Sequence, residues 1–173
     1  MRNCEKYNSS TCQLFMSKQR IENSALWKRT LASRGNDDKD SGEREELRAT
    51  FWKFRENAAA ITSRIAADFP DLTLHDVNHL DALWETADLL IGEEFLINPL
   101  EAFVLGGAIF LHDAALTFEA YEGGKSAVRE TPEWKDAFTA LQAKQPEMSK
   151  EELEKSADFD AIRYLHAAQA EQL

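Results

Sequence analysis

The chain has 173 residues, of which 43% are hydrophobic and 29% charged, and a formal net charge of −11. These values suit one soluble globular domain with a hydrophobic core and some additional chain. No apolar stretch is long enough to cross a bilayer, and the N-terminus lacks the apolar core of a signal peptide. Cys4 and Cys12 are too far apart for a CxxC pair. We therefore expect a cytoplasmic protein with reduced thiols and no membrane partner.

The charge is unevenly distributed along the chain. Residues 1–35 contain seven Lys/Arg and two Asp/Glu, a net +5, which leaves −16 for the rest. An acidic main body disfavours a groove for nucleic acid, because such a groove needs clustered positive charge. A nucleotide substrate stays open, since a metal can meet its phosphates. The basic N-terminal arm is more typical of a solvated lead-in than of a contact with phosphate or anionic lipid.

The first part of the chain is polar and irregular, and residues 33–42 have the composition of a linker. We expect a flexible arm and linker over residues 1–42 and a helical domain over residues 43–173. A short helix over residues 17–33 is compatible with a loose apolar face of Ile21, Leu26, Trp27 and Leu31.

The helical domain is predicted to begin with an amphipathic helix from Glu43 to the pair Phe69-Pro70. Its apolar residues recur at steps of three and four: Leu47, Phe51, Phe54, Ala58, Ile61 and Ile65. Such a stripe is more typical of a core-facing helix than of one that pairs with a partner. A second helix should begin near Thr73 or Asp76, both good N-caps, and end near Gly92.

A third helix has a clear start, with Asn98 as cap, Pro99 at the first position and Glu101 completing a capping box. Residues 100–111 have almost no polar face, which predicts a buried central helix.

The C-terminal part is expected to continue as helices after a loop through Gly123-Gly124. Thr131-Pro132 should open a fourth helix that ends before Pro146, and Ser149 with Glu152 forms another capping box for one or two further helices. Alternation with a period of two is scarce, and there is no internal repeat. The sequence therefore predicts an all-α fold.

Three of the four histidines lie in two short segments. His112 and Asp113 end the apolar run of the third helix, and His75 and His79 are four residues apart, a spacing that places them on one helix face. A divalent metal would explain these residues, since imidazole and carboxylate are common protein ligands; Mn, Fe, Co, Ni, Zn and Mg all remain open. Without a metal, His75 would be a helix cap and Asp113 a turn residue.

These motifs resemble the HD superfamily of metal-dependent phosphohydrolases. His79 with Leu83, followed by an apolar helix ending in His112-Asp113, matches the family pattern over roughly residues 47–116. The resemblance implies an HD-domain-like helical bundle in which His79, His112 and Asp113 bind the metal. His166 lies in a segment similar to a later helix that carries an extra histidine ligand, although as a residue of an amphipathic helix it could equally be half-buried surface.

The resemblance also bears on His75. Cyclic-nucleotide phosphodiesterases, which share the HD fold, have a histidine at the matching place, four residues before a metal ligand, and it protonates the leaving group. His75 and Asp113 are therefore the expected catalytic residues.

The chain departs from the family pattern in two places. Asp113-Ala114-Ala115-Leu116 replaces the more usual Asp-Ile-Gly, and the distal metal-binding aspartate has no persuasive match among Asp136, Asp158 and Asp160. The chain also ends inside an amphipathic helix. We therefore expect the N-terminal portion of an HD domain, with the missing ligand beyond Leu173 and an additional C-terminal domain or a homo-oligomer to cover the apolar surface.

Three functions are compatible with these residues. The first is hydrolysis of a phosphoester in a phosphorylated small molecule, a nucleotide or a nucleic-acid derivative, by metal-activated water. The alternative is a catalytically degenerate HD domain that senses a metal or nucleotide within a larger signalling or ATPase-linked protein. In the third, the chain is a helical interaction module and its histidines are incidental.

Overall fold

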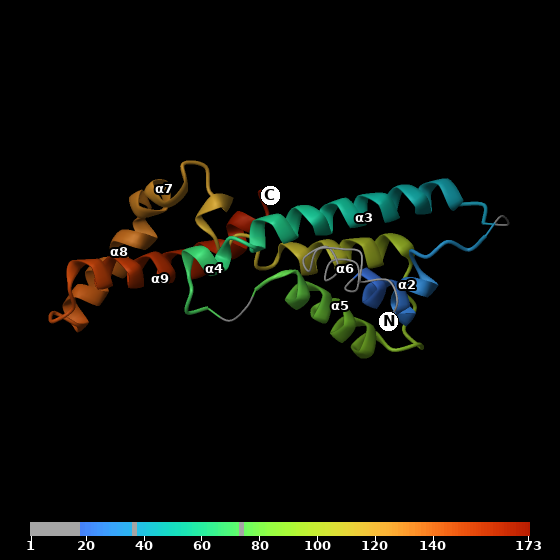
Figure 1. Cartoon of the computed structure of the whole chain (residues 1–173), viewed down its shortest axis with the longest axis horizontal. Coiled ribbons are helices and arrows are strands. Elements are labelled where there is room, and N and C mark those ends of the chain that lie inside the picture. Colours follow the sequence, from blue (N-terminus) through green and yellow to red (C-terminus); the bar gives the residue numbers. More distant parts are fainter. Residues whose placement is uncertain (1–17, 36–37, 73–74) are drawn as a thin grey trace, which may run out of the picture. The chain divides into compact units, whose positions relative to one another are not determined.

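The computed structural model describes residues 18–35, 38–72 and 75–173 of the protein (Figure 1). These residues form helices and turns and no strand, which confirms the predicted all-α fold. Residues 18–23 are helical, and the elements that follow are α2 (Ala25–Arg29), α3 (Ser41–Thr62), α4 (Ile65–Asp68), α5 (Val77–Ile91), α6 (Pro99–Leu111), the 3₁₀ turn η1 (Phe118–Ala120), α7 (Gly124–Glu130), α8 (Pro132–Lys144) and α9 (Lys150–Ala170). None of the described helices has the length and apolarity needed to span a membrane.

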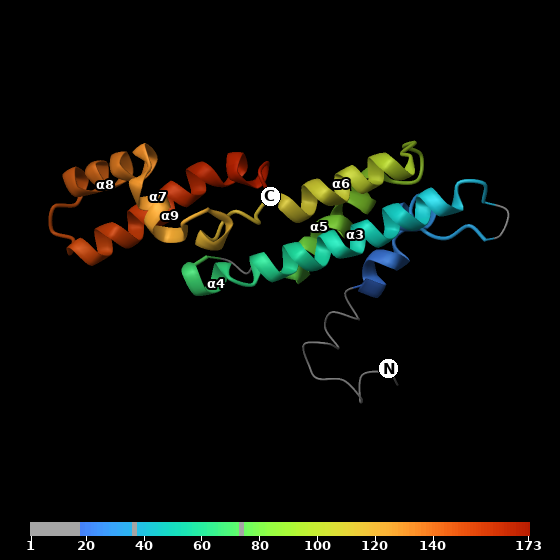
Figure 2. The ribbon, with the colours of Figure 1, turned by 90° about the horizontal axis from the view of Figure 1, so that it is seen from above.

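The chain forms two compact units. The first, which we call the N-terminal unit, comprises Met1–Arg55 and Val77–Ile109, and the second, the C-terminal unit, comprises Glu56–Asp76 and Phe110–Leu173. The division expected between residues 42 and 43 stays a prediction. In the N-terminal unit α5 and α6 lie alongside α3, and in the C-terminal unit α8 and α9 run side by side (Figures 1 and 2).

Aromatic rings form the core of the N-terminal unit. The Phe51 ring contacts those of Trp27 and Trp84 edge-on, with centroids 5.3 and 5.2 Å apart. Ser24 and Asp88 attach the N-terminal segment to α5, since the Trp84 indole N–H donates to Ser24 Oγ and the Leu26 amide donates to the Asp88 carboxylate. The apolar face predicted for residues 17–33 is confirmed, because its four members are all buried: Ile21, Leu26, Trp27 and Leu31.

A buried ion pair and a close helix contact fix α5 and α6 against α3. Arg55 on α3 donates two hydrogen bonds to the Asp81 carboxylate on α5, at 2.7 and 2.6 Å, and both side chains are almost fully buried. On α6, Gly106 lies so close to the Phe51 ring that a Cβ atom there would overlap it. The missing side chain is what lets α6 approach α3.

The prediction that α6 is buried all round is wrong. Only one face of the helix is buried, along Ala102, Gly106 and Phe110, whereas Leu100 and Val104 are about 60% exposed (59% and 60%). The capping box at its start is confirmed, with Asn98 accepting from the Glu101 amide and Glu101 accepting from the Asn98 amide.

The C-terminal unit has its own hydrophobic core, built from α4, η1, α7 and α9. Its buried members are Ile65, Phe69, Leu116, Phe118, Val128, Ala161 and Ile162. The helix predicted from Glu43 to Phe69 is interrupted at residues 63–64, where Thr62 and Ser63 turn their hydroxyl groups back onto the carbonyl oxygens of Ala58 and Ala60. Such bonds compete with the helical ladder and favour a break.

The capping residues at the C-terminal end behave as predicted, and one helix was missed. Thr131 caps α8, and Ser149 and Glu152 form the reciprocal capping box of α9, a single helix. Before them, α7 begins at Gly124 in a region expected to be a loop. Gly123 and Gly124 both have positive φ, at 84° and 61°, a conformation that only glycine adopts without cost and that sends the chain into α7.

Candidate metal centre

The turn after α6 places the His112-Asp113 pair. The Ala114 amide donates to the Leu111 carbonyl and the Leu116 amide to the Asp113 carbonyl, which closes two consecutive turns. Residues 113–118 are all buried, so the apolar side chains that follow Asp113 hold this turn in the core of the C-terminal unit. The sequence Asp113-Ala114-Ala115-Leu116, which departs from the family pattern, therefore serves to bury the turn.

Two imidazoles of the C-terminal unit meet the Asp113 carboxylate. His75 lies just before α5, and its Nε2 is 3.6 Å from Asp113 Oδ2; His112 Nε2 is 2.7 Å from the same oxygen. The side chains of His75 and Asp113 are 15% and 12% exposed, whereas that of His112 is 37% exposed. Two of the predicted site residues, His75 and His112, thus converge on the carboxylate of a third, Asp113.

This donor set fits a divalent metal. Imidazole nitrogen and carboxylate oxygen are the ligands that first-row metals and zinc prefer in the absence of thiolate. Two ligands of one tetrahedral ion with bonds near 2.1 Å lie about 3.4 Å apart, close to the 3.6 Å between His75 and Asp113. The 2.7 Å between His112 and Asp113 is a hydrogen-bond distance. His75 is therefore a candidate ligand as well as a candidate proton donor.

His79 belongs to the N-terminal unit, in the first turn of α5, where its side chain is half-buried. Its role as a metal ligand stays a prediction.

The structure does not bring His166 into the Asp113 cluster. Its Nδ1 lies 2.7 Å from the Arg163 carbonyl, one turn earlier on α9, and it is absent from any group of three candidate ligands among the described residues. Of the three aspartates considered for the distal ligand, Asp136 and Asp160 are exposed. His166 as a ligand stays a prediction that no contact supports.

Asp158, the third of these aspartates, is bound by other side chains. Arg129 donates two hydrogen bonds of 2.8 Å to its carboxylate, the Trp134 indole N–H donates a third, and Lys125 lies 2.9 Å away. Burial opposes ionisation of this group, but these donors outweigh burial and lower the pKa of Asp158. Asp158 therefore joins α7, α8 and α9 and offers no ligand. No local sequence pattern predicts this network, because its members are 24 to 33 residues from Asp158 in the chain.

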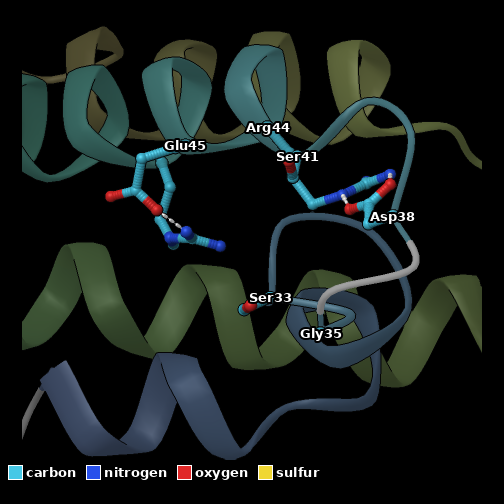
Figure 3. Close-up of a pocket in the computed structure, with 7 residues that line it drawn as sticks. Ser33, Gly35, Asp38, Ser41, Arg44 and Glu45 are labelled. Atoms are coloured by element: carbon cyan, nitrogen blue, oxygen red, sulfur yellow. Dashed lines mark hydrogen bonds and ion pairs between the residues drawn. The ribbon is translucent and has the colours of Figure 1, made fainter.

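The N-terminal unit contains a polar pocket of about 340 Å³ (Figure 3). Its two arginines are already paired: Arg44 binds the Asp38 carboxylate and the Thr30 carbonyl, and Arg48 binds Glu45. The other lining residues are Ser33, Gly35 and Ser41. The pocket is thus balanced in charge, and it presents no unmatched cation to a phosphate.

Comparison with known families agrees with the motifs in this structure. The family model HD-CE matches residues 69–173, more than half of the chain. The chain therefore belongs to the HD-CE family, an HD-related family, and the matched segment contains His75, His79 and the His112-Asp113 pair. No curated protein and no solved structure matches the chain.

Proposed function

We propose that the protein is a metal-dependent phosphohydrolase that cleaves a phosphoester of a nucleotide or a nucleic-acid-derived substrate. The observation that carries the proposal is the convergence of His75 and His112 on the Asp113 carboxylate, in a chain of an HD-related family. The acidic composition favours a small phosphorylated molecule over long nucleic acid, which needs a basic surface.

Asp113, His112 and His79 would hold the ion in this proposal, as the family pattern implies. When bound, a divalent metal lowers the pKa of water and neutralises charge on phosphoryl oxygens. For His112 to bind the ion through Nε2, its contact with the Asp113 carboxylate would have to be exchanged for the metal. Asp113 is mostly buried in the turn after α6, which fixes the direction in which its carboxylate points.

His75 is proposed to donate the proton that the leaving group needs. In the proposed step, water attacks phosphorus and gives up a proton to solvent, the ester P–O bond breaks, and the proton on His75 Nε2 passes to the leaving oxygen. The support is the place of this atom, 3.6 Å from Asp113 Oδ2, which would keep it next to a substrate bound to a metal that Asp113 holds. A positioned general acid contributes roughly 10² to 10⁴ in rate.

A second function is favoured by one observation about the distal ligand. Asp158 is bound by Arg129, Lys125 and Trp134, and Asp136 and Asp160 are exposed outside the cluster. With fewer carboxylates at the ion, the domain would bind metal or nucleotide without turnover. It would then act as a sensing module of a larger signalling or ATPase-linked protein.

Hydrolysis of bis-p-nitrophenyl phosphate with added Mn²⁺ separates the two functions. We expect the wild-type protein to hydrolyse it, Asp113→Ala to be inactive, and Glu147→Ala, at an exposed position of the same unit, to be unchanged. Bound metal without hydrolysis in the wild type would support the sensing module. Hydrolysis that survives Asp113→Ala would refute the proposed site.

A further inference from the structure

The N-terminal unit exposes large apolar side chains around the connection between α5 and α6. Leu96 is 93% exposed and Leu89 and Leu90 are each 82% exposed. The full set within residues 89–104, which we call the apolar face, is Leu89, Leu90, Phe95, Leu96, Leu100 and Val104. Single exposed leucines are ordinary, but six within one helical hairpin mark an interaction surface.

A groove borders this face. Leu100 and Phe103 of α6 line one wall, and the first turns of α3 supply Glu43, Glu46, Leu47 and Thr50. Its volume is about 390 Å³. Leu100 belongs both to the groove and to the apolar face, and Val104 lies one helical turn further along α6, so apolar surface continues from the groove along the helix.

All charged residues of the α5–α6 hairpin, which contributes the apolar face, are acidic apart from histidine. No Lys or Arg occurs between Arg64 and Lys125. Glu93, Glu94 and Glu101 are exposed within the hairpin, and the exposed Glu43 and Glu46 edge the groove. A ligand for this surface must therefore bring apolar side chains flanked by positive charge.

The acidic charge around the apolar face distinguishes among the partners that could cover it. A second copy of the chain would oppose two acidic rims, and an anionic bilayer would be repelled in the same way. A basic amphipathic helix satisfies both requirements, because its apolar residues recur at helical spacing and its lysines or arginines flank them. We propose that the apolar face and its groove dock a basic amphipathic helix of a partner protein.

The docking proposal is independent of the metal centre and is tested on the full chain. The probe is a synthetic amphipathic helical peptide with leucines at helical spacing and lysines on both flanks, and its binding is followed by fluorescence anisotropy at low and high salt. A peptide with glutamates in place of the lysines is the matched comparison. We expect binding of the lysine peptide that weakens with salt, and no binding of the glutamate peptide.

Two variants locate the binding surface. Leu96→Ser combined with Leu100→Ser should weaken binding of the lysine peptide by at least about tenfold, which corresponds to about 1.4 kcal/mol. Tyr164→Ser, at a side chain that is 76% exposed in the C-terminal unit, should change nothing. Circular dichroism of the double variant checks that it folds.

Four results would overturn the proposal. These are no binding of the lysine peptide, equal binding of both peptides, equal binding by the double variant, and binding of the wild type to phosphatidylserine vesicles that the double variant loses. Sedimentation tests the remaining occupant, since a wild-type dimer that Leu96→Ser dissociates would assign the face to a second copy.

Discussion

The two units use their polar side chains in different ways. In the C-terminal unit, two histidines meet Asp113 on one carboxylate oxygen, and three side chains bind the Asp158 carboxylate. In the N-terminal unit the buried Arg55 and Asp81 pair across two helices, and the α5–α6 hairpin exposes large apolar side chains. The proposed chemistry therefore uses side chains of the C-terminal unit together with His79 of α5, and the proposed docking surface lies on the N-terminal unit.

Within the C-terminal unit the two aspartates also differ, although both are buried. Asp158 is saturated by a guanidinium, an ammonium group and an indole N–H, which fixes it as a structural anchor. Asp113 faces imidazoles, which can release it to a metal when they are neutral. Since both carboxylates are buried, the side chains that contact them, and not burial, distinguish the candidate ligand Asp113 from the structural residue Asp158.

The largest effect is expected from His75→Ala. If His75 is the proton donor, metal content should stay at the wild-type level while turnover of a phosphodiester falls roughly 10² to 10⁴-fold. Elemental analysis and steady-state kinetics on the same sample measure both. Loss of the metal would instead make His75 a ligand, as its 3.6 Å spacing from Asp113 also allows.

A comparably severe loss, now of stability, is expected from Asp158→Ala. The change leaves Arg129 without its main partner in a mostly buried network, and breaking a buried pair costs about 3 to 5 kcal/mol. Denaturant unfolding followed by far-ultraviolet circular dichroism measures the loss. An unfolding free energy equal to that of the wild type would show that the network is not required.

A smaller change in stability is expected when either of two neighbouring glycines of α6 is replaced by alanine, and the two changes should have opposite signs. Gly106→Ala places a Cβ against the buried Phe51 ring and should destabilise the N-terminal unit by about 1 to 3 kcal/mol. Gly107→Ala meets only a Phe54 ring carbon at 3.7 Å, an ordinary contact, so it should stabilise the helix by about 0.5 to 1 kcal/mol. Thermal unfolding of the two variants measures the difference, and equal shifts would contradict the close approach of α6 to α3.

The smallest effect concerns pH. Donors from Arg129, Lys125 and Trp134 hold the pKa of Asp158 below its ordinary value of 3.8, despite burial. The stabilisation from the ionised form is therefore complete above that ordinary value and lost as pH falls through the lowered pKa. The difference in unfolding free energy between wild type and Asp158→Asn should shrink on acidification below about pH 4. A difference that stays constant across that range would exclude this linkage.

Local rules predicted much of the fold. The capping residues Asn98, Thr131 and Ser149 mark helix starts because their side chains accept hydrogen bonds from amides only three residues away. The break after Thr62 was missed because the apolar stripe continues through it. The start of α7 was missed because a glycine pair is equally typical of a loop.

Contacts between distant residues could not be predicted. The composition of α6 suggests that every side of the helix is buried. Only the face that carries Gly106 is buried, and it packs against Phe51 of α3. At the candidate metal centre, the motif pointed to His112 and Asp113, and the structure places His75 beside the same carboxylate oxygen. Nothing in the local sequence around Asp158 indicates the arginine that binds it.

Metal content after loading with Mn²⁺ and exhaustive dialysis tests the central claim, that Asp113 anchors a metal centre. Wild type, Asp113→Ala and Glu147→Ala should be measured side by side by elemental analysis. We expect bound metal in wild type and Glu147→Ala, and none above background in Asp113→Ala. Equal metal content in all three proteins would contradict the metal centre.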